Sequence, residues 1–183
     1  TDALNNEKIS NNPEKVRYYS HLIKQENLRM KKQVENVLNM SKLERNEVKL
    51  FLKETNVREL IKDVSKSFRL IVEERKGVLT EEFKAEHYHV KVDEFHLSNA
   101  LINLLDNANK YSPNTPEITI STRNEGNYYV IEISDKGMGM EQQNKTKIFE
   151  KFFVKKIIEL HNGQIIVDSE KDKGSTFTIK IPM

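Results

Sequence analysis

Apolar residues in the first part of the chain recur with a helical spacing. Between residues 16 and 40 they form a heptad stripe of Val16, Ile23, Met30 and Val37, flanked by Tyr19, Val34 and Met40. Most other positions in this stretch are polar or charged, so the pattern predicts a long amphipathic helix. Because the stripe is narrow and no second core in the sequence could cover it, we expect this helix to pair with another helix. Folding back onto its own domain is the alternative.

From Val48 onward, short alternating segments and helical segments follow one another. The predicted elements are a strand over 48–57, a helix from Asn56 to about Arg75, strands over 77–84 and 88–92, a helix around Asn99–Tyr111, a hairpin over 117–135, a helix from about Val154 to His161, and strands over 163–170 and 175–182. This order predicts an α+β fold, a two-layer α/β sandwich in which helices cover one face of a mixed sheet.

Two regions are expected on this basis. Residues 1–45 are interpreted as part of a helical hairpin that is cut off near its turn, with "TDAL" as the tail of an earlier helix. Residues 46–183 are interpreted as the one domain with a main core, which suits a chain of 183 residues of which 37% are hydrophobic.

Charge and cysteine content exclude several classes of function. Thirty basic and 28 acidic side chains leave a formal charge of +2, which does not indicate binding to nucleic acid or to a membrane surface. The absence of cysteine excludes disulfides and thiolate metal sites. No apolar run approaches the ~20 residues that a membrane-spanning helix needs, so we expect a soluble, cytoplasmic segment. A membrane anchor elsewhere in a parent protein is left open.

The predicted helix around Asn99–Tyr111 has two contrasting faces. Its apolar face carries Leu97, Leu101, Leu104, Leu105 and Ala108, and the opposite arc carries Asn99, Asn103, Asp106, Asn107 and Lys110. A solvated outer face would explain a polar arc, but asparagine is a poor helix former, so three asparagines at a spacing of four favour a use. Amide oxygens can ligate Mg²⁺, and a nearby lysine can bind phosphate.

A second candidate is the stretch "ISDKGMGM", in which a predicted strand ends at Asp135. Gly137 and Gly139 follow at a spacing of two, so a carboxylate stands beside backbone that can approach a ligand closely. Taken alone, the pattern is equally typical of a tight turn leaving a strand. The asparagine-rich helix upstream and "IFEKFF" downstream favour a binding site.

Together these motifs resemble those of the sensor histidine kinases, whose catalytic domain shares the ATP-binding fold of gyrase, the Hsp90 chaperones and the MutL repair proteins. "NLLDNANKYS" is similar to the family's asparagine box, "DKGMGM" to its first glycine box, "IFEKFF" to its phenylalanine box and "GSTFTIKIP" to its closing strand. The resemblance extends from about Val48 to the end, and the upstream helix resembles the second helix of the family's dimerisation and phosphotransfer hairpin.

The resemblance implies a role for each matched position. Asn107 and Asn103 would face Mg²⁺, and Lys110 and Tyr111 would contact the phosphates and the nucleotide. Asp135 would accept a hydrogen bond from the adenine amino group, which is the basis of a preference for adenine.

The remaining matches surround these residues. They are Gly137 and Gly139, which would line the base pocket; Phe149, Phe152 and Phe153, an aromatic box beside a lid or simply packing at its base; and Ser175 and Thr176, which would help close the pocket through a water. The implied ligands are ATP and Mg²⁺, and the implied reaction is transfer of the γ-phosphoryl group to a histidine.

Two departures from the family pattern bear on that reaction. First, no histidine is followed by an acidic residue and Thr-Pro, as the family's acceptor is, and His21 is expected to face solvent. His87 and His89 could ligate zinc, but a solvated strand face is the simpler interpretation because no third ligand is near. Second, "EKFF" runs straight into "VKKIIELHNG", without the family's second glycine box and lid. An omitted stretch between Phe153 and Val154 is favoured over a true deletion.

Three functions therefore compete. The leading one is the kinase core of a two-component sensor, a homodimer through the N-terminal helix that passes phosphate to a response-regulator receiver domain. The alternatives are another ATPase of the same superfamily and a degenerate, non-enzymatic dimerising module. The signal sensed and the cognate regulator lie outside these residues.

Overall fold

A computed structural model describes residues 12–45, 48–140 and 153–183. The chain divides into two compact units, Thr1–Val48 and Lys49–Met183. The elements in chain order are α2 (Pro13–Glu44), β1 (Lys53–Asn56), α3 (Val57–Glu74), β2 (Val78–Phe83), β3 (His89–Val92), α4 (Glu94–Lys110), β4 (Glu117–Glu125), β5 (Tyr128–Asp135), α6 (Phe153–Leu160), β6 (Gln164–Glu170) and β7 (Gly174–Pro182).

The first unit contains the predicted long helix, α2, of 32 residues. Asn12 caps its start, because its side-chain Oδ1 accepts the backbone N–H groups of Glu14 and Lys15 at 3.1 Å. Exposed side chains include the stripe residue Met30 and its flanking neighbour Val34, at 50% and 58% exposure, and His21 as expected. The "TDAL" fragment lies outside the described residues.

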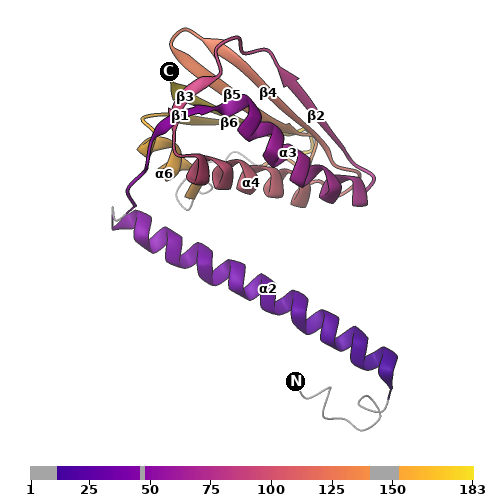
Figure 1. Ribbon diagram of the computed structural model, residues 1–183. Coiled ribbons are helices and arrows are strands. Elements are labelled where there is room, and N and C mark those ends of the chain that lie inside the picture. The colour runs from indigo at the N-terminus through magenta and orange to yellow at the C-terminus, as the bar shows by residue number, and fades with distance from the viewer. Residues whose placement is uncertain (1–11, 46–47, 141–152) are drawn as a thin grey trace. The chain divides into compact units, whose positions relative to one another are not determined.

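The second unit is the predicted α+β sandwich. A five-stranded sheet has the order β2-β4-β5-β7-β6, and helices α3, α4 and α6 pack along one of its faces (Figure 1). The pair β2 and β4 is parallel, and the other neighbours are antiparallel, so the sheet is mixed.

One expectation about the strands was wrong. The strand predicted over 48–57 is limited to β1, and β1 pairs with β3 in a separate two-stranded antiparallel sheet. The alternation of apolar and polar residues does not show which strand a segment pairs with. It could therefore not distinguish a strand of the main sheet from one that forms a separate two-stranded sheet. His87 lies outside β3, and both His87 and His89 are exposed.

The core lies between the sheet and the helices. The five apolar residues predicted on one face of α4 are at most 1% exposed, and Tyr129, Ile131 and Ile133 of β5 are equally buried. Alternate residues of β5 therefore face the helices, as a period of two requires.

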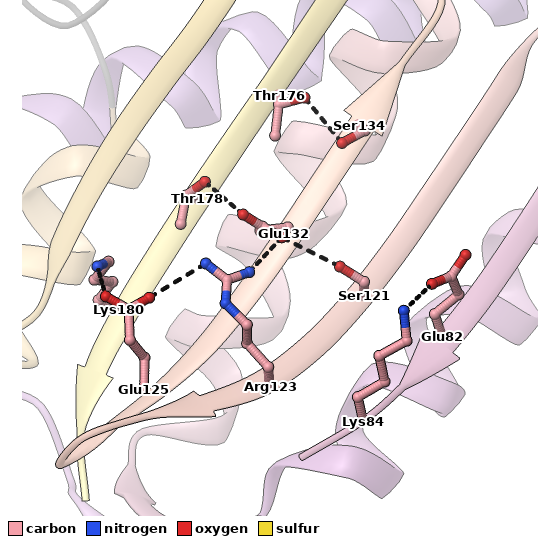
Figure 2. Close-up of polar contacts among 10 residues, drawn as sticks. All are labelled: Glu82, Lys84, Ser121, Arg123, Glu125, Glu132, Ser134, Thr176, Thr178 and Lys180. Atoms are coloured by element: carbon pink, nitrogen blue, oxygen red, sulfur yellow. Dashed lines mark hydrogen bonds and ion pairs between the residues drawn. The ribbon is translucent and has the colours of Figure 1, made fainter.

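The other face of the sheet is polar. On it, Glu132 pairs with the guanidinium of Arg123 and accepts from Thr178 Oγ1 at 3.2 Å, and Glu125 pairs with both Arg123 and Lys180 (Figure 2). Val130 lies between Arg123 and Lys180 in the strand register and is fully buried. The aliphatic stems of long charged side chains can cover an apolar neighbour in this way.

Candidate functional site

Helix α4 carries the first group of candidate residues. It begins at Glu94, earlier than predicted, because Asp93 is its N-cap and its carboxylate accepts His96 N–H at 3.0 Å. The predicted division of faces is confirmed. The polar arc of Asn99, Asn103, Asp106, Asn107 and Lys110 is half-buried or exposed while the apolar arc is buried.

A hydrogen bond orients one of the asparagines on this arc. Asn103 Nδ2 donates one of its two N–H groups to the backbone carbonyl of Asn99 at 2.8 Å, and its Oδ1 remains an acceptor or potential metal ligand. Asn107 is half-buried one turn further along the helix. At the helix end, Lys110 Nζ lies 5.3 Å from the ring centroid of Tyr111, whose side chain is 48% exposed. Carboxamide oxygens beside an exposed ammonium fit a magnesium-bound anion.

Asp135 ends β5 and is only 9% exposed. Burial raises the pKa of its carboxyl, and hydrogen bonds from the backbone N–H groups of Gly137 and Ser175 partly oppose that rise. The bond from Gly137 ends at Oδ1 and measures 2.8 Å. A buried acceptor at a strand end can select a ligand that offers an N–H group.

The glycine loop brings Asp135 next to the end of α4. The backbone N–H of Met138 donates to the carbonyl of Tyr111 at 3.0 Å. A Cβ atom at Gly137 would lie 2.5 Å from the same carbonyl oxygen, so only glycine permits this approach. Two of the predicted motifs, the asparagine helix and the first glycine loop, therefore meet through one peptide group.

The opposite side of the loop rests on the β6–β7 turn. Gly139 has a φ of 59°, and a Cβ atom there would collide with the carbonyl oxygen of Glu170. The Asp172 N–H donates to the Met138 carbonyl at 2.7 Å. Backbone contacts thus hold the loop from both sides.

The two candidate hydroxyl residues of β7 separate. Ser175 pairs with Asp135 in the strand register, and its Oγ lies 3.0 Å from Ser169 Oγ. Thr176 instead bonds Ser134 Oγ at 2.9 Å on the polar face of the sheet (Figure 2). Of the two, Ser175 is therefore the one beside Asp135.

The aromatic candidates cannot all be located. Phe149 and Phe152 lie outside the described residues, and Phe153 is the half-buried first residue of α6. Within the described ranges, no group of three or more histidine and carboxylate side chains could hold a metal ion, so the zinc alternative for His87 and His89 gains no support.

Two polar clusters around α4 were missed by sequence reasoning. At its start, buried His161 of the α6 C-terminus accepts the Asp93 N–H at Nε2, at 3.0 Å, and its Nδ1 lies 2.7 Å from the Ile157 carbonyl. Because Asp93 N–H can only donate and Ile157 O can only accept, the imidazole is the neutral Nδ1–H tautomer. Burial lowers the pKa of His161. His161 and His96 both contact Asp93.

At the other end of α4, Arg75 at the C-cap of α3 binds the final turn. Its guanidinium donates to the backbone and side-chain oxygens of Asn109 and to the Ser112 carbonyl. Asn109 was left out of the polar arc, and its side chain is indeed buried.

The fold and the position of the glycine loop define the class, a two-layer ATPase-type domain. The chain belongs to the family of histidine kinase-, DNA gyrase B- and HSP90-like ATPases, whose model matches residues 92–183. The resemblance inferred from the motifs is therefore confirmed. Within the described residues, no helix is both long enough and apolar enough to cross a bilayer.

Curated relatives are named as sensor proteins. The chain is 33% identical to the sensor protein RprX of Bacteroides fragilis, over 96% of this chain and 38% of that protein. It is 27% identical to the sensor-like histidine kinase SenX3 of Mycolicibacterium smegmatis, over 94% and 50% respectively. The chain thus spans half or less of the length of these relatives.

Solved structures share the fold. The histidine kinase AdeS of Acinetobacter baumannii matches with a TM-score of 0.76 and 26% identity, over 94% of this chain and 86% of that one. Full-length ShkA in complex with AMPPNP has a TM-score of 0.82 at 18% identity, over 91% and 38%. ThkA in complex with the response regulator TrrA has 0.77 at 24%, over 93% and 52%. These last two show the fold alone.

The alignments with RprX and SenX3 each contain positions of the relative that have no counterpart in this chain. The RprX alignment covers 196 residues but uses 96% of the 183 residues here, about 176, so about 20 positions have no counterpart. The SenX3 alignment covers 192 residues with about 172 of this chain, which leaves about 20 again.

Proposed function

We propose that residues 46–183 bind an adenine nucleotide with Mg²⁺, as the catalytic domain of a sensor histidine kinase. One observation supports this most strongly: the hydrogen bond from Met138 to Tyr111 brings the end of the asparagine helix beside buried Asp135. Asn103 and Asn107 would hold the metal, whose charge would neutralise phosphate oxygens. Lys110 and Tyr111 would contact the phosphates and nucleotide, and Asp135 would accept the adenine amino group.

The glycine loop and its surroundings complete the proposed pocket. Gly137 and Gly139 would line the adenine base, Ser175 would close the pocket beside Asp135, and Phe153 would pack at the base of the lid. The domain's contribution to phosphoryl transfer would be to orient the phosphates, because such a transfer depends mainly on position and electrostatics.

The partners follow from the wider family and from two exposed apolar side chains of α2. The proposed protein is cytoplasmic in this segment and dimerises through α2, whose exposed Met30 and Val34 would be covered by a second copy. The acceptor histidine would lie on a segment of the parent outside this sequence, and a response-regulator receiver domain would take the phosphate. ThkA, one of the structural neighbours, forms such a complex with the response regulator TrrA.

The shortfall of about 20 aligned positions supports the interpretation that a lid segment is missing from the sequence as given. Backbone amides at a helix N-terminus hold triphosphates well, so their loss would weaken phosphate binding more than adenine binding. A binding comparison of ATP, ADP and adenosine would measure this. A lidless domain would gain little affinity from each added phosphate.

Calorimetric titration with ATP and GTP, with and without Mg²⁺, tests the proposal on this chain. We expect ATP to bind more tightly than GTP and Mg²⁺ to strengthen binding. Absence of ATP binding to both this chain and the intact parent would favour the non-enzymatic module. Acid-labile phosphate on a chain that includes the upstream helix would distinguish a kinase from another ATPase.

Asp135→Asn gives a second readout. Since burial raises the pKa of the Asp135 carboxyl, the folded state disfavours its charge, and stability falls as pH rises from the ordinary aspartate value of 3.8 toward the higher folded value. The neutral amide has no charge to titrate, so the melting temperature of the variant should depend less on pH above 3.8 than that of the unchanged chain. It should lose adenine selectivity, because one oxygen replaces two.

A further inference from the structure

Arg75 is the C-cap residue of α3, but its side chain serves α4. Nη1 donates to the Asn109 carbonyl and, at 3.0 Å, to Asn109 Oδ1. Nη2 donates to the carbonyls of Ser112 at 2.6 Å and Asn114 at 3.2 Å. One guanidinium therefore meets four oxygen atoms within six consecutive residues.

Of the three residues that supply these acceptors, Asn109 and Ser112 have little access to water, whereas Asn114 is exposed. Asn109 is 9% exposed and Ser112 is 2% exposed. The last carbonyls of a helix lack partners within the helix, and a cation is favoured at that negative end. The flat fork of an arginine can satisfy several of them at once, which the single ammonium of a lysine cannot reproduce.

The acceptors stand on either side of the candidate nucleotide residues. Lys110 and Tyr111 lie between Asn109 and Ser112 in the chain, and the Tyr111 carbonyl accepts the Met138 N–H at 3.0 Å. The guanidinium thereby fixes the peptide to which the glycine loop is bound. Asp135 is two residues before Gly137, which packs against the same carbonyl.

We propose that Arg75 is a positioning residue for the nucleotide site, acting through the end of α4 on Lys110, Tyr111 and the glycine loop. The proposal rests on the proposed nucleotide function. An arginine that only stabilised the fold would lower the melting temperature without a specific effect on the affinity of the folded protein for nucleotide.

Arg69 provides the matched control. It lies on the same helix, its Nη1 also donates to a backbone carbonyl, that of Leu79 at 2.8 Å, and it pairs with Glu81 at 3.2 Å. Arg69→Met and Arg75→Met therefore make the same chemical change on one helix, and only the second removes contacts to α4.

Titration of both variants and the unchanged chain with Mg-ATP, below their melting temperatures, gives the test. We expect Arg75→Met to raise Kd by about tenfold or more, the equivalent of one charged hydrogen bond. Arg69→Met should bind like the unchanged chain. Arg75→Lys should bind with an intermediate Kd because it keeps the charge but not the fork.

Equal Kd values for Arg75→Met and Arg69→Met would overturn the inference. Amide hydrogen exchange at Met138 in the nucleotide-free protein supplies a second arm, with faster exchange expected in Arg75→Met, or in Arg75→Lys if the methionine variant does not fold. Unchanged exchange there would also contradict it. If the unchanged chain and its parent fail to bind ATP, the proposed function itself fails.

Discussion

The two ends of helix α4 differ in how accessible their polar side chains are to solvent. At its start, Asp93 and His161 are almost fully buried, and Asp93 accepts the N–H groups of His96 and Phe51 while its own N–H is bound to His161. At its end, Lys110 and Tyr111 are exposed. Asp93 and His161 are thus bonded within the protein, whereas Lys110 and Tyr111 are accessible to solvent, beside Asn109 and Ser112, which are buried and bound to Arg75.

The comparison shows how burial separates two roles for polar side chains. A buried polar group without a partner is costly, so the start of α4 is expected to contribute to stability. An accessible asparagine lowers the stability of a helix and makes no buried contact in exchange. The C-terminal end of α4 is therefore expected to contribute to ligand binding. Substitutions at the two ends should therefore separate an effect on stability from an effect on nucleotide affinity.

The largest effect is expected at the start of the helix. Asp93→Ala removes the N-cap and leaves the N–H groups of His96 and Phe51 without their carboxylate, at a cost of about 2–4 kcal/mol of unfolding free energy. Urea unfolding measures this loss. Nucleotide affinity measured on the folded variant should change little, and a large loss of affinity at unchanged stability would contradict the division between the two ends.

The next effect is expected at the other end. Asn107→Ala should weaken Mg-ATP binding by about tenfold or more, because it removes a proposed metal ligand. Stability should stay the same or rise by about 0.5 kcal/mol, since alanine is the better helix former. Asn99→Ala is the control, because Asn99 lies on the same arc but two turns before Asn107. Equal affinities for the two variants would remove Asn107 from the site.

The two ends of α4 also differ in how well the sequence predicts them. The faces of α4 were predictable because leucines and asparagines repeat with a local period of 3.6 residues. Asp93 followed by Glu94 was a recognisable helix start that the periodicity alone did not reveal. Met138 and Tyr111 could be associated only through the family motifs, which carry information about tertiary contacts.

The contacts that no local pattern reveals are those between distant residues. His161 and Asp93 are 68 positions apart, and Arg75 and Asn109 are 34 apart. In a sequence, a buried histidine and a capping arginine look like any others. Their roles follow from the packing of α6 and α3 against α4, which sets partners and burial at once.

A smaller effect concerns the pH dependence of stability. Burial lowers the pKa of His161, so below about pH 6.5 the unfolded chain binds a proton that the folded imidazole does not take up. Stability should therefore fall on acidification from pH 6.5 toward the lower folded pKa, by at most about 1.4 kcal/mol per pH unit from this group. The nearby Asp93 carboxyl, whose pKa is lowered, loses its contribution only in more acidic solution, below its ordinary value of 3.8.

Urea unfolding at pH 7.5, 6.5 and 5.5 measures this slope. His161→Gln should make the slope shallower, whereas His89→Gln, an exposed histidine on β3, is the matched control for loss of an imidazole. Nitrogen NMR should find His161 as the Nδ1–H tautomer at pH 7. A protonated ring or the opposite tautomer would contradict the bonds at the start of α4.

The smallest effect is expected where a candidate residue faces away from Asp135. Thr176→Val keeps the shape of the side chain but removes the hydroxyl that bonds Ser134 on the polar face of the sheet, at a cost of about 1 kcal/mol or less. ATP affinity should not change, because the neighbouring Ser175 is the residue paired with Asp135. Ser175→Ala is the matched comparison and should weaken binding. If Thr176→Val weakens ATP binding as much as Ser175→Ala does, residues on both faces of β7 contribute to nucleotide binding. The site would then extend beyond the residues beside Asp135 and the exposed end of α4.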